Sequence, residues 1–106
     1  MEFKNVKIVV YVPVSHSDKI RDVLAKNEAG HIGNYDYCSF SCIGTGRFRG
    51  LEGSNPSIGQ KGKIEEVKEE RIETICEFSK LDKVLKALNN AHPYEEPAID
   101  VFPLLN

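Results

Sequence analysis

Apolar residues alternate near the start of the chain and predict a buried strand. On an extended segment they fall on both faces, with Val6, Ile8, Val10 and Val12 on one face and Val9 and Tyr11 on the other. A strand that is apolar on both faces is typical of the centre of a sheet. We therefore expect a central strand that ends at Pro13, because proline cannot donate to a ladder. A chain of 106 residues has little material to cover both faces, which indicates a partner subunit.

Two later segments repeat apolar residues at helical spacing, and each begins with the pattern S-x-x-D. The first runs from Ser15 to about residue 28, with Gly30 as its stop, and the second runs from Ser79 to about residue 90. This pattern is a variant of the capping box. The stretches SHSDKIRDVL and SKLDKVLKAL also resemble each other. Convergent capping chemistry is one explanation of this short similarity, and a duplication is the other.

Three further strands are expected at residues 35–43, 70–78 and 98–104. The order is then strand, helix, strand, strand, helix, strand. It predicts an α+β ferredoxin-like βαββαβ sandwich, one domain over residues 1–106, with the antiparallel sheet order 4-1-3-2. Six of the eight glycines fall within residues 44–63, which indicates a flexible glycine-rich hairpin loop. This loop, His16 and His92 should share one edge of the sheet, and His31 should lie at the opposite edge.

Composition narrows the class of protein. A hydrophobic content of 41% with 28% charged residues is globular, and a net charge of −2 argues against a dedicated nucleic-acid binder. No apolar run approaches the ~20 residues of a membrane span, and no secretion signal is recognisable. The cysteines Cys38, Cys42 and Cys76 form no C-x-x-C pair. We expect reduced thiols, a cytoplasmic location and burial on core faces.

The glycine-rich loop carries a local positive charge. Its basic residues outnumber its one acidic residue, Glu52, and are Arg47, Arg49, Lys61 and Lys63. Arginines and backbone amides bind phosphate or carboxylate groups, so a small anionic ligand is one interpretation. A solvated, flexible hairpin is the other. The glycine spacing matches neither a dinucleotide-binding motif nor a P-loop.

The stretch HPYEEP at residues 92–97 suggests a metal site. An imidazole and a carboxylate three residues apart, His92 and Glu95, are suited to a divalent ion, with His16 as a third ligand. The alternative is structural, with His92 capping the second helix and the prolines shaping a turn. No nucleophile–base pair is apparent, so an enzymatic role is the less favoured one.

Several motifs resemble one family over nearly the whole chain. GHIGNYDYC at 30–38, GTGRFRG at 44–50, SNPSIG at 54–59 and HPYEEP at 92–97 look like the insert domain of the Nif-three-like (YqfO) proteins, here as a stand-alone copy. The resemblance implies a PII/CutA-type fold and a homotrimer. The dinuclear metal site of full-length relatives belongs to another domain and has no counterpart in this chain.

HPYE at 92–95 also resembles a C-terminal motif of CutA proteins, which implies a copper-type role for Glu95. We therefore expect a small oligomeric, non-enzymatic binding or regulatory module. Its working surfaces would be residues 44–63 and the edge near His92, with a small anionic ligand or a protein as partner. The alternative is a CutA-like protein that binds a divalent metal ion.

Overall fold

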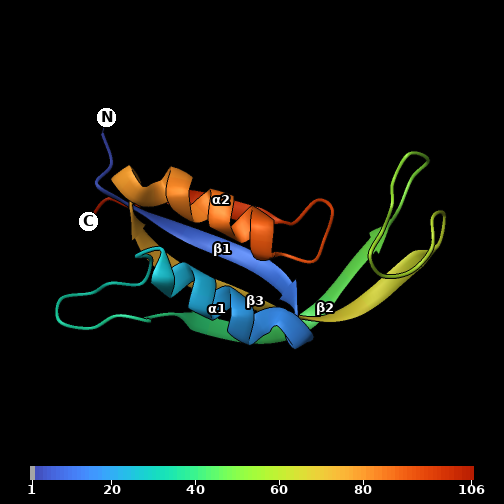
Figure 1. The fold of residues 1–106 in the computed structure, drawn as a ribbon, viewed down its shortest axis with the longest axis horizontal. Helices are drawn as coiled ribbons and strands as arrows, with labels where there is room; N and C mark the ends of the chain where they lie inside the picture. Colours follow the sequence, from blue (N-terminus) through green and yellow to red (C-terminus); the bar gives the residue numbers. More distant parts are fainter. Residues whose placement is uncertain (1) are drawn as a thin grey trace.

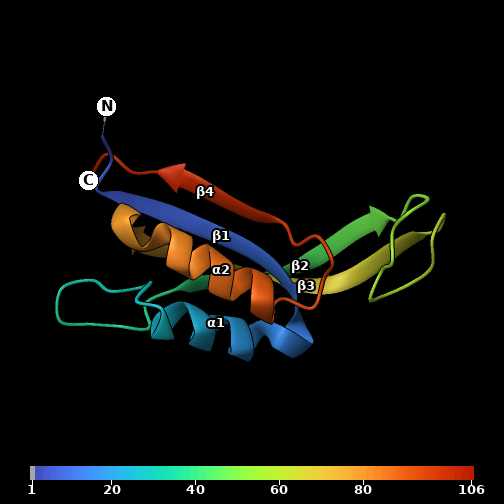
Figure 2. The ribbon, with the colours of Figure 1, turned by 45° about the horizontal axis from the view of Figure 1, so that its top comes forward.

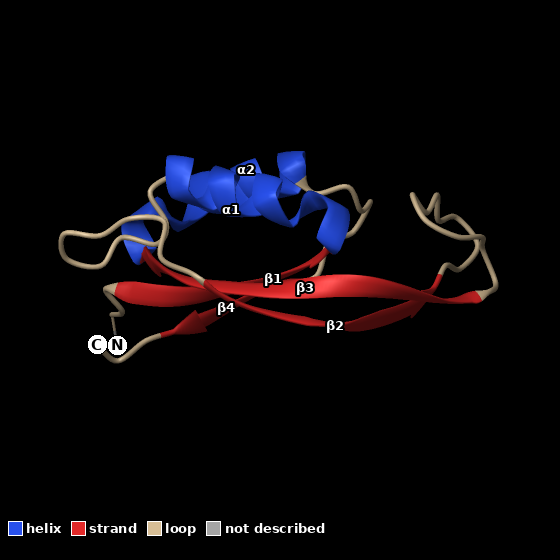
Figure 3. Cartoon of the chain, turned by 90° about the horizontal axis from the view of Figure 1, so that it is seen from below, coloured by secondary structure: helices blue, strands red, loops and turns tan. Residues whose placement is uncertain are grey.

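The structure, a computed structural model, describes residues 2–106 as a four-stranded sheet with two helices on one of its faces (Figure 3). Its elements, in chain order, are β1 (Asn5–Pro13), η1 (Val14–His16), α1 (Ser17–Lys26), β2 (Phe40–Arg49), β3 (Ile64–Glu77), η2 (Phe78–Lys80), α2 (Leu81–Ala91) and β4 (Ile99–Pro103). The sheet is antiparallel with the order β2-β3-β1-β4. The βαββαβ order and the 4-1-3-2 sheet are thereby confirmed.

The core lies between the helices and one face of the two central strands. Its members are apolar and almost fully buried: Val6, Ile8, Val10 and Val12 of β1, Ile72 and Cys76 of β3, Ile20 and Leu24 of α1, and Val84 and Leu88 of α2. The alternation of β1 places every second residue on this face. The predicted central strand and its helix-facing side are confirmed.

The two halves of the chain repeat with an offset of 64 residues. The 3-10 turn that starts at Val14 corresponds to the one that starts at Phe78, and the helices that follow begin at Ser17 and Leu81. The predicted capping boxes are not formed, because neither helix has a side-chain hydrogen bond at its N-terminus. The chain instead enters each helix through the 3-10 turn, so the serine of S-x-x-D lies inside the turn.

The β2–β3 hairpin is longer than the sequence predicted. β2 runs from Phe40 to Arg49 and β3 from Ile64 to Glu77, so the connecting loop is confined to residues 50–63. The two strands extend past the helices as a twisted arm (Figures 1 and 2). Gly44 and Gly46, which suggested a loop, lie within β2. A Cβ at Gly46 would collide with the carboxylate of Glu69, so the absence of a side chain there leaves room for this carboxylate.

The helix-free face of the sheet is apolar in part. Val9 lies on this face as its alternation with Val10 predicts, but it is buried within the chain and needs no partner subunit to cover it. Glu73 lies directly opposite Val9 and pairs with Lys7 and Arg71. Phe40, in register with Glu73, is 64% exposed. On the edge strand, Phe102 lies opposite Lys7 and is 48% exposed.

The three cysteines do not share one environment. Cys76 is buried in the core as predicted, but Cys38 is half-buried and Cys42 is exposed. The prediction for Cys42 was wrong because its register partner, Arg71, faces away from the helices. All three thiols are free of disulfides. Within residues 2–106, neither helix has the length and apolar character needed to cross a membrane.

Candidate functional site

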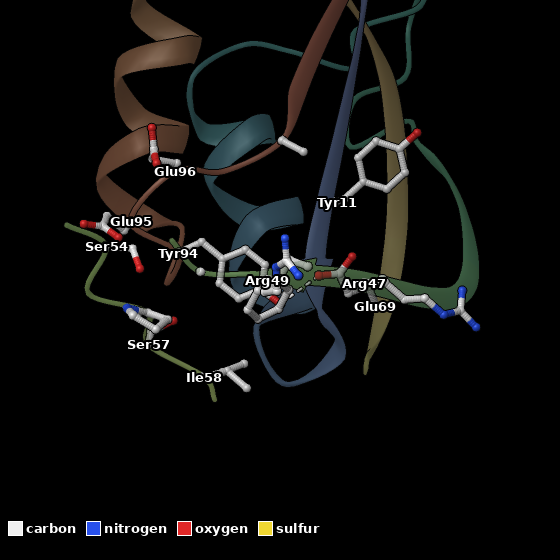
Figure 4. A pocket seen from close by; sticks show the side chains of 15 residues that line it. Tyr11, Arg47, Arg49, Ser54, Ser57, Ile58, Glu69, Tyr94, Glu95 and Glu96 are labelled. Carbon is white, nitrogen blue, oxygen red and sulfur yellow. Dashed lines mark hydrogen bonds between the residues drawn. The ribbon is translucent and has the colours of Figure 1, made fainter. Parts of the chain in front are cut away.

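A cavity of about 330 Å³ opens between the β2–β3 hairpin and the segment that follows α2 (Figure 4). The hairpin supplies residues 46–50 and Glu69, and its loop supplies residues 54 and 56–58. The second wall is residues 94–96 and 98, and Tyr11 of β1 completes the lining. The chain crosses from the end of α2 to the edge strand β4 at this point, so the cavity lies where β1 ends. A volume of this size is at the lower end of the range for small-molecule sites, roughly 300–1,000 Å³.

Two aromatic rings meet at the wall of the cavity. Phe48 of β2 and Tyr94 are packed edge to face, with ring centroids 5.8 Å apart. Tyr94 also contacts the imidazole of His92 at 5.1 Å between centroids. The apolar contact ties the hairpin arm to the segment after α2, although nearly fifty residues separate them in sequence.

The hydroxyl of Tyr94 donates a hydrogen bond of 2.7 Å to Glu69 Oε2. Burial is the larger cause that raises the pKa of Tyr94, and the bond to Glu69 adds to it. The phenol is therefore protonated at neutral pH and remains a donor. Part of the negative charge of Glu69 is thus already engaged at the cavity.

The hairpin loop is joined to the opposite wall by one polar contact. The backbone N–H of Asn55 donates to Glu95 Oε2 at 3.0 Å. Glu95 therefore links the loop to the segment after α2. A divalent ion at Glu95 would compete with this hydrogen bond.

The four basic residues of the predicted binding loop are not gathered in one place. Arg47 and Arg49 line the cavity, whereas Lys61 and Lys63 do not. Arg47 Nε lies 3.7 Å from Glu66 Oε1, and its side chain points away from Tyr94 (Figure 4). Among residues 2–106, Arg49 has no carboxylate within 4.0 Å. Arg49 is therefore the cavity's available cation.

His92 is buried, and both of its ring nitrogens are engaged. The backbone N–H of Tyr94 donates to Nδ1 at 3.1 Å, so Nε2 carries the proton and donates to the carbonyl of Tyr11 at 2.7 Å. Burial lowers the pKa of this imidazole, which favours the neutral form. The histidine joins the end of β1 to the segment after α2, which is the structural alternative considered for it.

The predicted grouping at one edge of the sheet is found in the structure. His16 lies in η1 directly after the end of β1, His92 bonds to the carbonyl of Tyr11 near that end, and the hairpin arm extends from the same end of the domain (Figure 1). Residues 30–38, which include His31, form a loop at the other end. Within residues 2–106, no three His, Cys, Asp or Glu side chains are placed to hold a metal ion together. The metal role of His92, Glu95 and His16 stays a prediction.

Three cavity residues were missed by sequence reasoning: Phe48, Glu69 and Tyr94. Glu69 belongs to an acidic stretch with Glu65, Glu66 and Glu70, and such a stretch is typical of a solvated surface. Tyr94 was visible as part of HPYEEP, but its partner 25 residues earlier was not. The contact between the two depends on the register of the hairpin and leaves no local pattern.

The fold defines the chain as a ferredoxin-like α+β domain of CutA type. CutA from Archaeoglobus fulgidus, described as a periplasmic divalent cation tolerance protein, superposes with a TM-score of 0.70 at 18% identity, over 96% of this chain and 85% of that one. CutA1 from Shewanella sp. SIB1 superposes with a TM-score of 0.72 at 14% identity, over 100% and 86%. Such identities demonstrate a shared fold alone.

Sequence similarity is much higher to a different set of proteins. A GTP cyclohydrolase 1 type 2 homolog from Halalkalibacterium halodurans is 51% identical over 100 residues, which are 94% of this chain and 27% of that relative. The Mycobacterium tuberculosis protein of the same name is 44% identical over 99 residues, 93% and 26%. A Bacillus cereus protein related to NIF3 superposes with a TM-score of 0.85 at 49% identity, over 98% and 26%. No family model matches the chain.

The resemblance to the Nif-three-like proteins is thereby confirmed. The chain is a homologue of one segment of these NIF3-related proteins, and it spans about a quarter of the length of the relatives that it matches.

Proposed function

We propose that the protein is a small oligomeric binding module that takes an anionic small molecule in the cavity beside Tyr94. The observation that carries the proposal is Arg49, which lines the cavity and has no carboxylate within ion-pair distance among the described residues. A guanidinium binds carboxylate or phosphate through two parallel hydrogen bonds. The rings of Phe48 and Tyr94 supply an apolar surface beside it.

Two of the three carboxylates that line the cavity are already compensated in part. Glu69 accepts the Tyr94 hydroxyl and Glu95 accepts the Asn55 amide, whereas the third, Glu96, adds negative charge that the arginines must outweigh. The second arginine, Arg47, adds positive charge at the rim, although it is shared with Glu66. The combination favours a ligand with an anionic end and a less polar body.

Isothermal titration calorimetry with inorganic phosphate and with citrate tests the proposal. Arg49→Gln should weaken binding of the better probe about 10–100-fold, the usual effect of losing a charge-assisted hydrogen bond. Lys61→Gln is the matched control, since it removes the same charge from the same hairpin outside the cavity. Equal weakening by both variants would mean that the loop acts through its net charge, and the cavity assignment would be wrong. If neither phosphate nor citrate binds, the proposal is contradicted for both anion classes.

The oligomer is proposed to be a trimer formed through the helix-free face. Exposure of Phe40 and Phe102 on this face supports it, because each large apolar side chain buried in an interface contributes roughly 1.5–3 kcal/mol. Light scattering should then give about three times the 11.9 kDa of one chain. Phe40→Glu should dissociate the assembly, whereas Ile43→Glu should not, since Ile43 is also exposed but pairs with Glu70 on the helix side. A monomer would contradict the proposal, and a dimer would contradict the trimer.

Divalent metal binding is the alternative for the same edge. The position of His16 and His92 near the same end of β1 supports it, but an ion on His92 must displace the bond to Tyr11 or the bond from Tyr94. Copper titration of the wild type and of His92→Gln separates the two functions, since the anion site does not require this imidazole.

The three free thiols support a reducing, cytoplasmic compartment.

A further inference from the structure

Four exposed apolar side chains lie at the end of the domain opposite the cavity. We call them the terminal surface: Ile32 and Tyr35 on the loop 30–38, Phe78 in η2, and Leu105 near the end of the chain. Tyr35 is 74% exposed and Leu105 is 91% exposed. Clusters of this kind on small soluble domains mark interaction sites more often than isolated apolar residues do.

Hydrogen bonds hold the loop 30–38 at its base and at its tip. Its base is tied to β3, where the amide of Gly30 donates to the carbonyl of Ile75 at 2.7 Å and the hydroxyl of Thr74 donates to the carbonyl of Cys38 at 2.6 Å. Its tip is closed by reciprocal backbone bonds between Ile32 and Tyr35, at 2.9 and 3.0 Å. The two apolar tip residues are therefore presented in a defined arrangement.

One residue of this loop is held in an unfavourable backbone conformation. Tyr37 has a φ of +56°, which bulky side chains rarely adopt, and its hydroxyl donates to Asp22 Oδ1 at 3.0 Å. Such conformations persist where the surrounding structure enforces them, and they cluster at functional sites. The loop is thus ordered more than a simple connection between α1 and β2 requires.

The remaining members of the terminal surface lie beside this loop. Glu28, two residues before the loop base, pairs with Lys80 of η2 and so brings residues 28–30 next to Phe78. The amide of Phe78 in turn donates to the carbonyl of Lys4 at 2.8 Å. The backbone of Phe78 is therefore held next to the residue before the first strand, and its side chain is exposed.

Both ends of the chain leave the domain at this same place. Asn5 Nδ2 donates to the carbonyl of Asn106 at 3.1 Å, and the amide of Leu104 donates to the carbonyl of Asn5 at 3.0 Å. Glu77, one residue before Phe78, is the register partner of Asn5. Figures 1 and 2 show the ends of the chain and the loop 30–38 at the same end of the long axis.

The relatives that this chain matches are longer than the chain. The matched segment is about a quarter of their length, so the other three quarters connect through one or both of its ends. Because both ends lie together, any such connection leaves beside the terminal surface. The hairpin cavity, at the far end of the long axis, points away from it.

We propose that the terminal surface docks on an apolar surface of the part of a NIF3-related protein that this chain does not cover. Ile32 and Tyr35 are the principal contacts, with Phe78 and Leu105 at the margin. The contact would fix the orientation of the domain and leave the cavity free. It does not depend on the anion-binding function proposed above.

The test is a chimera in which this chain replaces the matched segment of the Halalkalibacterium halodurans relative. Hydrogen–deuterium exchange at residues 31–37 should be at least tenfold slower in the chimera than in the isolated chain. The double variant Ile32→Ser, Tyr35→Ser should abolish that slowing while leaving the melting temperature of the isolated chain nearly unchanged. The control pair Leu51→Ser, Ile64→Ser changes equally exposed apolar residues of the hairpin and should have no effect on residues 31–37.

Three results would overturn the proposal. The first is equal exchange of residues 31–37 in the isolated chain and the chimera. The second is an equal effect of the control pair. The third is protection of these residues in the isolated chain that grows with its concentration, which would make a second copy the occupant. If the chimera does not fold, exchange in the natural relative at the loop aligned with residues 31–37 supplies the same comparison, with the same criteria.

Discussion

The carboxylate of Glu69 lies over Gly46 on the neighbouring strand, in space that a side chain at position 46 would occupy. From there it accepts the hydroxyl of Tyr94 at 2.7 Å. A glycine in the middle of β2 thereby allows the contact between the hairpin and the segment after α2. Glycine lowers the stability of a strand, and the hydrogen bond between Tyr94 and Glu69 at the cavity offsets this loss.

Replacement of Gly46 by alanine should push the carboxylate away from Tyr94. Without the hydrogen bond and the nearby charge, the raised pKa of Tyr94 should fall toward its usual range, although burial, its larger cause, remains. The ultraviolet absorbance of phenolate during an alkaline titration, with Tyr94→Phe as the reference, measures this change. Gly44→Ala is the control, because a Cβ there meets no atom within 4 Å. Identical tyrosine titrations in the two variants would show that Glu69 does not act on Tyr94.

Acid should weaken the fold partly through Glu28. Its ion pairs with Lys80 and Lys83 lower its pKa from 4.5 to about 2, with the hydrogen bond from Lys80 as the first cause. A lowered pKa means that its contribution is complete above pH 4.5 and is lost as the pH falls toward 2. Urea unfolding should show a smaller loss of stability across this window in Glu28→Gln than in the wild type. Glu52→Gln, which removes a carboxylate without an ion pair among residues 2–106, should retain the wild-type slope.

The repeat with an offset of 64 residues predicts equivalent core positions. Leu24 of α1 and Leu88 of α2 are 3% and 0% exposed, and each faces the sheet. Truncation of either to alanine should lower the free energy of unfolding by about 2–5 kcal/mol. Leu51→Ala, in the exposed hairpin loop, should change it by less than about 0.5 kcal/mol. A small effect at only one of the two helices would mean that the halves do not contribute equally.

The thiols should react with alkylating reagents in the order Cys42, Cys38, Cys76. Cys42 is exposed on the helix-free face, whereas Cys76 is buried, and burial raises the pKa of its thiol. Mass spectrometry of partly labelled native protein gives the order directly. Since an oligomer through the helix-free face would cover Cys42, its labelling should accelerate on dilution. Rapid modification of Cys76 in the native state would contradict the assigned core.

The sequence by itself determined the element order, the central strand and the similarity of the two helical segments. These features depend on patterns that are local: the alternation over residues 6–12 and the spacing of Ile20, Leu24, Val84 and Leu88. The spacing of apolar residues indicates which residues lie on the same face of a strand or helix. Few chain topologies are compatible with this order of strands and helices. The resemblance of GHIGNYDYC and HPYEEP to the Nif-three-like proteins led to the same fold.

Tertiary structure decided which face of each strand meets the helices and which side chains meet at the cavity. Cys38 and Cys42 alternate as core residues would, yet the register with Arg71 turns Cys42 to the open side. A period of two cannot distinguish the two faces when both carry apolar residues. The cavity depends on the register of the hairpin and on the path of the chain after α2. Contacts such as that between Glu69 and Tyr94 join segments far apart in sequence, so no local pattern could have predicted them.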